Sequence, residues 1–122
     1  MNGLTFLLVF LGGGLGSVSR YGIGLISLKF YDGKFPIGTI LANLLACLIL
    51  GYGLYLIKEN INQTSWLKYF VLIGFCGGFS TFSTFSAETL KLFQDQLYFF
   101  GVLNILISII LGVFIIYLFT KA

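Results

Sequence analysis

The sequence contains no histidine, a single proline and only four acidic residues. Without histidine, and without paired carboxylates or a nucleophile beside a base, the chain lacks the groups that enzymes use for acid–base and nucleophilic catalysis. Charged residues make up 9% of the chain, and the basic ones behind its net charge of +3 are scattered rather than gathered in a patch. We therefore expect neither an enzyme nor a nucleic-acid-binding protein.

Hydrophobic residues make up 58% of the sequence and gather in long runs. A membrane-spanning helix needs about 20 apolar residues, and four stretches are long enough: Leu4–Leu28, Ile37–Ile57, roughly Trp66–Glu88, and Leu97–Thr120. The short connections between these stretches leave no room for a domain outside the membrane. The sequence thus predicts an all-α, multi-pass protein of the cell membrane, with residues 1–122 forming a single four-helix domain in the lipid bilayer.

The third stretch contains a Gly-Gly pair, five hydroxyl residues and repeated phenylalanines between Gly74 and Glu88. At 1.5 Å per residue, a helix that begins near Trp66 reaches Gly77–Ser80 after about 17–21 Å, which is the middle of the bilayer. Because glycine weakens a helix, we expect the third helix to break at Gly77-Gly78, where freed carbonyl oxygens could bind a hard cation. The alternative is a glycine pair that only allows close helix packing.

The residues after the expected break carry groups that can stabilise a small anion. Phe82 and Phe85 are three apart and share a helix face, and the edge of a phenyl ring carries partial positive charge. The hydroxyls of the same run, among them Ser83 and Thr84, donate hydrogen bonds without the desolvation cost of a buried charge. This pattern indicates the lining of a pathway for a small solute, and the alternative is ordinary packing of the phenylalanines.

Two other stretches carry polar side chains at helical spacing. Thr39 and Asn43 lie four apart on the second stretch, and Asn104 and Ser108 lie four apart on the fourth. An unpaired amide in lipid is costly, so Asn43 either donates to a passing anion or forms hydrogen bonds within the protein. Asn104 and Ser108 either extend the polar route or hold helices together.

Two charged residues lie near one membrane face. Arg20 is about 24 Å along the first helix if that helix begins at Leu4, and Glu88 lies equally far along the third. Either the two side chains form an ion pair, or Arg20 makes a vestibule positive and concentrates anions there.

The loop charges do not favour one orientation in the membrane. Four spans place three lysines on each side, with Lys58, Lys68 and Lys121 on one and Lys29, Lys34 and Lys91 on the other. The positive-inside rule therefore does not select an orientation, unless one lysine dominates or Arg20 weakly favours the side of Lys29, Lys34 and Lys91. We interpret this balance as insertion both ways up. An antiparallel homodimer would then let a chain too small to enclose a route alone complete one with a second copy.

The residues quoted above resemble those of the CrcB/Fluc fluoride channels. The resemblance covers the whole chain and is strongest over Gly74–Glu88. Gly38-Thr39 with Asn43 is similar to the family's second-helix pattern, and Gly12-Gly13 with Arg20-Tyr21 to its first. Three positions depart from the pattern: Ser80 where threonine is usual, Ala46 where glycine is usual, and Asn104 where tyrosine is often found.

The resemblance implies a dual-topology homodimer with two fluoride pores and a central sodium ion. The backbone carbonyls of Gly77 and Ser80 would hold the sodium ion. The fluoride path would be lined by Asn43, Phe82 and Phe85, with further polar contacts from Thr39 and Ser108, and Arg20 would lie near its mouth.

The expected activity is passive export of fluoride. Fluoride binds its water strongly, so its route must be dense in neutral hydrogen-bond donors, yet weak enough to release the ion. Two other functions are compatible with a chain of this size. A small multidrug exporter would need a mid-membrane carboxylate for proton exchange, which the first helix lacks. A non-transporting scaffold would use the small and polar residues for helix packing alone.

Overall fold

The computed structural model describes residues 2–59 and 66–121. The described residues fold into helices and contain no strand. In chain order the elements are α1 (Gly3–Phe30), α2 (Ile37–Glu59), η2 (Leu67–Phe75), α3 (Cys76–Phe79), α4 (Phe82–Gln94) and α5 (Tyr98–Thr120). The segment η2 is a π-helix, and it joins α3 and α4 to form the third of four stretches long and apolar enough to cross a membrane. The prediction of four spanning helices is confirmed.

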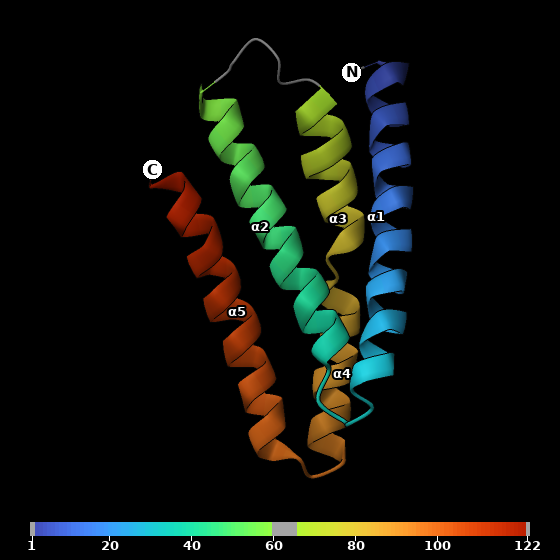
Figure 1. Cartoon of the computed structure of the whole chain (residues 1–122), viewed down its shortest axis with the longest axis vertical. Coiled ribbons are helices and arrows are strands. Elements are labelled where there is room, and N and C mark those ends of the chain that lie inside the picture. The colour runs from blue at the N-terminus through green and yellow to red at the C-terminus, as the bar shows by residue number, and fades with distance from the viewer. Residues whose placement is uncertain (1, 60–65, 122) are drawn as a thin grey trace.

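The four spans form an elongated bundle (Figure 1). The start of α1 and the end of α5 lie at one end of the bundle, and the connections from α1 to α2 and from α4 to α5 lie at the other. The helix α1 runs beside η2 and α3, and α2 lies between this pair and α5. The third span continues to Gln94, beyond the expected end at Glu88.

Glycine lets α1 approach the third span closely. A Cβ atom at Gly12 would overlap the backbone carbonyl oxygen of Phe70, and one at Gly16 would overlap that of Phe75. On the opposing helix, a Cβ atom at Gly78 would overlap the carbonyl oxygen of Gly13. Backbone thus packs directly on backbone, as is common for helices in membranes, where small residues allow close contact.

The interior of the bundle is small and centred on the third span. Ala42, Ala46 and Phe79 form a buried cluster, and Phe75 packs against it. The alanine at position 46 is only 3% exposed, so α2 accommodates its methyl group against the third span. Many large apolar side chains elsewhere are exposed, as expected for helices that face lipid.

The predicted position of the helix break is wrong by a few residues. Gly77 and Gly78 are both helical and belong to α3, whereas the helix opens at Ser80 and Thr81, which have extended backbone. Gly78 stays helical because its missing side chain allows contact with α1, a packing role that outweighs the cost of glycine in a helix. The break has helices of nine and four residues before it and of thirteen after it. It therefore lies at the middle of the span.

Candidate functional site: the break in the third span

The chain opens between α3 and α4 through two residues with extended backbone. Ser80 ends α3 with ψ of 160°, and Thr81 precedes α4 with φ of −153° and ψ of 121°. The hydroxyl oxygen of Thr81 accepts a hydrogen bond from the Thr84 N–H at 3.1 Å, which caps the N-terminus of α4. The negative end of one helix dipole and the positive end of another thus meet at the same depth.

Some carbonyl oxygens at the break are satisfied within the protomer. The Cys76 carbonyl accepts from both the N–H and the hydroxyl of Ser80, at 3.0 and 2.7 Å. The Gly78 carbonyl accepts from Nε of Arg20 at 3.2 Å, and the Thr81 carbonyl accepts from Nδ2 of Asn43 at the same distance. Both outside donors come from neighbouring helices, Arg20 from α1 and Asn43 from α2.

Three other carbonyl oxygens at the break receive no hydrogen bond from the described part of the chain: those of Gly77, Phe79 and Ser80. Unpaired carbonyls cost several kcal/mol in hydrocarbon, so these oxygens require a ligand or a partner. Unwound backbone at a helix C-terminus can coordinate Na⁺ in membrane proteins. The free oxygens of Gly77 and Ser80 could therefore hold a cation of the kind expected from the sequence.

Asn43 lies directly against the break. Its Oδ1 accepts from the Thr81 N–H at 2.7 Å, while its Nδ2 donates to the Thr81 carbonyl. The interpretation that Asn43 bonds across helices is therefore confirmed. The carboxamide carries two N–H donors and one of them remains, so donation to an anion is compatible with this geometry.

Arg20 and Glu88 do not form an ion pair. Among the described residues, the ion pairs are those of Asp95 with Lys34 and with Lys91. Arg20 instead donates to the Gly78 carbonyl, where its charge complements the C-terminal end of α3. Glu88 lies on α4, and its Oε1 atom is buried with no hydrogen-bond partner among the residues that the structure describes.

The two phenylalanines after the break differ in exposure. Phe82 is 79% exposed on the surface of the protomer, whereas Phe85 is half-buried. Their ring centroids are 6.0 Å apart with planes inclined by 43°, so they form a tilted pair as their spacing suggested. Ser83 is exposed beside Phe82 and Thr84 is half-buried. Aromatic rings and hydroxyls thus lie together on a face that the protomer leaves uncovered.

The polar residues of α5 form a connection inside the protomer. Asn104 is 1% exposed and donates to the hydroxyl of Thr89 at 2.9 Å, and Thr89 donates to the Phe85 carbonyl at 2.7 Å. Ser108 donates to Oδ1 of Asn104 at 3.5 Å, a long hydrogen bond. The interpretation that the stripe holds helices together is confirmed for Asn104, which bonds to α4, whereas Ser108 bonds within α5 and its role stays a prediction. Sequence reasoning missed Thr89, although a threonine four residues after Phe85 in an apolar span could have suggested it.

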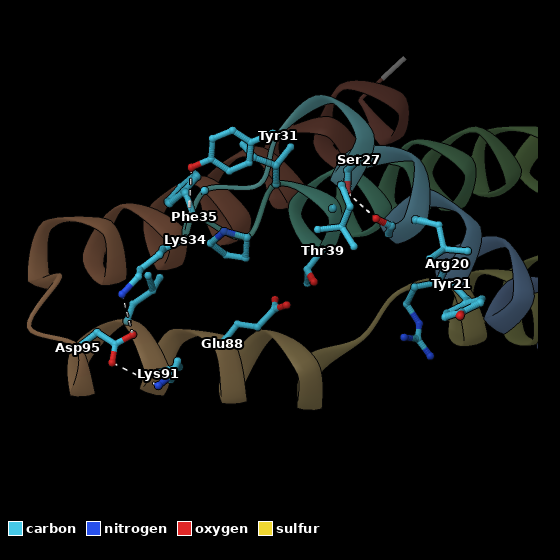
Figure 2. Close-up of a pocket in the computed structure, with 18 residues that line it drawn as sticks. Arg20, Tyr21, Ser27, Tyr31, Lys34, Phe35, Thr39, Glu88, Lys91 and Asp95 are labelled. Carbon is cyan, nitrogen blue, oxygen red and sulfur yellow. Dashed lines mark hydrogen bonds and ion pairs between the residues drawn. The ribbon is translucent and has the colours of Figure 1, made fainter.

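A cavity of about 670 Å³ opens between α1, the start of α2 and α4 (Figure 2). Thr39 and the carboxylate of Glu88 face into it, Arg20 lies toward one end, and the Lys34–Asp95 ion pair (3.7 Å) lies at the other. The cavity carries charges of both signs, and its lining reaches from Arg20 to the connection between α1 and α2 and to the second half of α4.

Four apolar spans, one of them opened at mid-length by a polar break, define a multi-pass membrane protein with the features of a transport pathway. The chain matches the family described as "CrcB-like protein, Camphor Resistance (CrcB)" over residues 7–119, and it belongs to this family. The resemblance noted in the sequence is thereby confirmed.

The chain is similar to several proteins named "Fluoride-specific ion channel FluC". It is 40% identical over 112 residues to one from Dehalococcoides mccartyi strain CBDB1, which covers 92% of this chain and 86% of the relative. It is 40% identical over 118 residues to one from Pyrococcus abyssi (97% and 94%). It is 41% identical over 110 residues to one from Flavobacterium psychrophilum (88% and 87%). The family is one of membrane channels and not of enzymes, and this chain is a multi-pass protein of the cell membrane.

Proposed function

We propose that this protein is a fluoride channel that lets cytoplasmic fluoride leave the cell passively. The observation that carries the proposal is the polar break at the middle of the third span, in a chain whose relatives are named fluoride-specific channels. In this proposal residues 1–122 form a single channel domain. No ATP-binding motif and no other energy source is needed, because an ion that follows its own gradient requires only a route.

The working unit in this proposal is an antiparallel homodimer with two pores. Its support is the face around the break, where Phe82 and Ser83 are exposed and the space beside Gly77 is open. Free carbonyls facing hydrocarbon are too costly to leave uncovered. Because the break lies at the middle of its span, two inverted copies would place their breaks at the same depth, and the three lysines at each end give neither orientation an advantage.

The two ends of the break serve opposite charges in this proposal. The carbonyl oxygens of Gly77 and Ser80 from both copies hold a structural sodium ion at the C-terminal end of α3. On the other side, the first turn of α4 presents the N–H groups of Phe82 and Ser83, which donate to no group in residues 2–59 and 66–121, at the positive end of its dipole. A fluoride ion would meet these donors without meeting a fixed charge that holds it too tightly.

The fluoride path follows from this arrangement. Asn43 contributes its remaining N–H, and Phe82 and Phe85 contribute ring edges. The hydroxyls of Ser83 and Thr84 donate hydrogen bonds to the ion in place of its hydrating water. Thr39 contributes a hydroxyl in the vestibule, and Ser108 contributes one along α5. Arg20 and Glu88 contribute charges to the vestibule, and Arg20 also donates to the Gly78 carbonyl.

Ion efflux from liposomes tests the proposal. Purified protein reconstituted into vesicles loaded with potassium fluoride should release fluoride when valinomycin lets potassium leave, as recorded with a fluoride electrode. Vesicles loaded with potassium chloride serve as the control and should retain their chloride. A scaffold protein would release neither ion, and an exporter would require an imposed proton gradient, so either result would contradict the proposal.

Orientation is tested separately with an Asp32→Cys variant, since Asp32 lies in the connection between α1 and α2 and the native cysteines lie within spans. A membrane-impermeant maleimide applied to intact cells should label about half of the copies if the chain inserts both ways up. Labelling of all copies or of none would show a single orientation and would contradict the antiparallel dimer.

A further inference from the structure

We infer that Asn43 is a positioning residue that takes up the Thr81 N–H and thereby leaves the Gly77 carbonyl oxygen free to bind a cation. In an unbroken α-helix the Thr81 N–H would donate to the carbonyl four residues earlier, which is that of Gly77. Here it donates to Oδ1 of Asn43 at 2.7 Å instead. The side chain of α2 has replaced the helical partner, and the oxygen of Gly77 has lost its donor. This inference rests on the proposed sodium site.

The carboxamide suits this role because it offers an acceptor and a donor in one plane, as a peptide group does. Both groups of Asn43 bond to the backbone of Thr81, since Nδ2 also donates to the Thr81 carbonyl at 3.2 Å. The side chain therefore fixes the direction of the Thr81 peptide unit. Packing holds the amide in place, because the neighbouring Ala42 is fully buried and Ala46, one turn later, packs with Phe79 of α3.

A second tether acts from the other side of the break. Arg20 of α1 donates to the Gly78 carbonyl, so the two oxygens that face neighbouring helices of the protomer are occupied. The oxygen of Gly77 belongs to an exposed residue with open space beside it. The tethers thus occupy the Gly78 carbonyl and the Thr81 N–H, and the Gly77 carbonyl remains available to a cation. Asn43 retains one N–H, so positioning the break and donating to an anion can reside in one side chain.

Three variants separate these roles. Asn43→Ala removes both the acceptor for the Thr81 N–H and the donor to the Thr81 carbonyl. Asn43→Asp keeps an acceptor oxygen, loses the donor and adds negative charge to the anion path. Asn104→Ala is the matched control, because it removes the buried amide of another span, whose hydrogen bonds go to Thr89 and Ser108 rather than to the break.

The first measurement is the NMR amide resonance of Thr81 in the full-length protein. The sequence contains two Ser-Thr dipeptides, Ser80-Thr81 and Ser83-Thr84, so labelling serine at the carbonyl carbon and threonine at nitrogen isolates two amide signals. The Thr81 amide proton signal should move upfield in Asn43→Ala, which removes its acceptor. It should stay near its wild-type position in Asn104→Ala, and it should not move upfield in Asn43→Asp, which keeps an acceptor oxygen. The Thr84 signal, whose N–H donates to the Thr81 hydroxyl, should persist in all of them as an internal reference.

The second measurement is the sodium concentration that gives half of the sodium-dependent rise in thermal stability, with choline chloride keeping ionic strength constant. Loss of a group that orients a metal ligand typically weakens metal binding about 10–100-fold. We expect that increase in Asn43→Ala alone, while Asn43→Asp binds sodium as well as the wild type and conducts fluoride poorly. An unshifted Thr81 signal, or an unchanged sodium requirement, in Asn43→Ala would overturn the inference. A wild-type protein indifferent to sodium would instead overturn the proposed cation site, and with it the role assigned to the Gly77 oxygen.

Discussion

The contact between α1 and the third span predicts a large effect from one methyl group. In Gly16→Ala the new Cβ atom would overlap the Phe75 carbonyl oxygen and lie 2.8 Å from the Phe79 nitrogen. Both are backbone atoms, so no side chain can rotate to relieve the clash. The helix α1 must therefore move away by on the order of 1 Å, and a gap of that size already forfeits about a quarter to a half of the dispersion attraction across it.

The movement should also reach the break. Arg20 lies one turn beyond Gly16 on α1, and its hydrogen bond to the Gly78 carbonyl is already 3.2 Å long. A shift of the helix lengthens it past the limit for a hydrogen bond. Overpacking typically costs about 1–3 kcal/mol and a transmembrane hydrogen bond about 1 kcal/mol, so we expect Gly16→Ala to lower the free energy of unfolding by about 2–4 kcal/mol. Fluoride flux should fall as well, because a carbonyl at the break has lost its donor.

The assay is unfolding in mixed micelles with rising SDS, followed by the fluorescence of Trp66, the single tryptophan of the chain, next to η2. The matched control is Gly14→Ala, two residues away on the same helix, where a Cβ atom would meet nothing within 4 Å. The control should be neutral or should gain up to about 1 kcal/mol, because alanine favours a helix more than glycine does. Equal stability of the two variants would refute the idea that α1 is held in place by direct backbone contact.

Three further predictions concern single side chains. Phe82→Ile keeps an apolar side chain but removes the ring edge, so fluoride flux should fall by about tenfold. The variant should elute like the wild type in size-exclusion chromatography. An unchanged flux would show that ring edges take no part in conduction. Asn104→Leu should lower the free energy of unfolding by about 1–2 kcal/mol. In a double-mutant cycle with Thr89→Val, the coupling free energy between the two positions should account for most of that loss. Additive effects would contradict the buried hydrogen bond at 2.9 Å. Asp95→Asn removes the partner of Lys34 and should lower the free energy of unfolding by about 0–1 kcal/mol in low salt and by nothing measurable in 1 M salt. A loss of stability that persists in high salt would show that the contact is not mainly electrostatic.

The sequence was sufficient to predict the elements of this fold because lipid simplifies the pattern. A span must be long, apolar and helical, so hydropathy alone places four of them. The same reasoning places the polar break in the third span. What it missed was the position of the opening, which lies after Phe79 rather than at the glycines. A capping signal was present in Thr81, whose hydroxyl accepts from the Thr84 N–H, and it is a better marker of a helix start than a glycine pair is of a helix end.

The partners of the polar groups could not be predicted from the sequence, because they depend on contacts between distant parts of the chain. Asn43 and Thr81 are 38 residues apart, and Arg20 and Gly78 are 58 apart. Sequence spacing indicated only that each side chain needed a partner. It offered Glu88 as the natural one for Arg20, since opposite charges at similar depth attract. The structure gives Arg20 a carbonyl instead, because α1 is pressed against α3 through glycines that bring the guanidinium to the end of that helix.

These two long-range hydrogen bonds suggest why a polar opening can persist at the middle of a membrane. A broken helix in hydrocarbon tends to close, since closure would pair each free N–H with a free carbonyl. Closure is opposed here on both sides, as Asn43 occupies the N–H that would pair with Gly77 and Arg20 occupies the carbonyl of Gly78. Each tether satisfies a backbone group that closure would otherwise satisfy, so the open form loses less than the number of missing helical hydrogen bonds suggests. The oxygens left over then lie on a face of the protomer where an ion or a second copy can reach them.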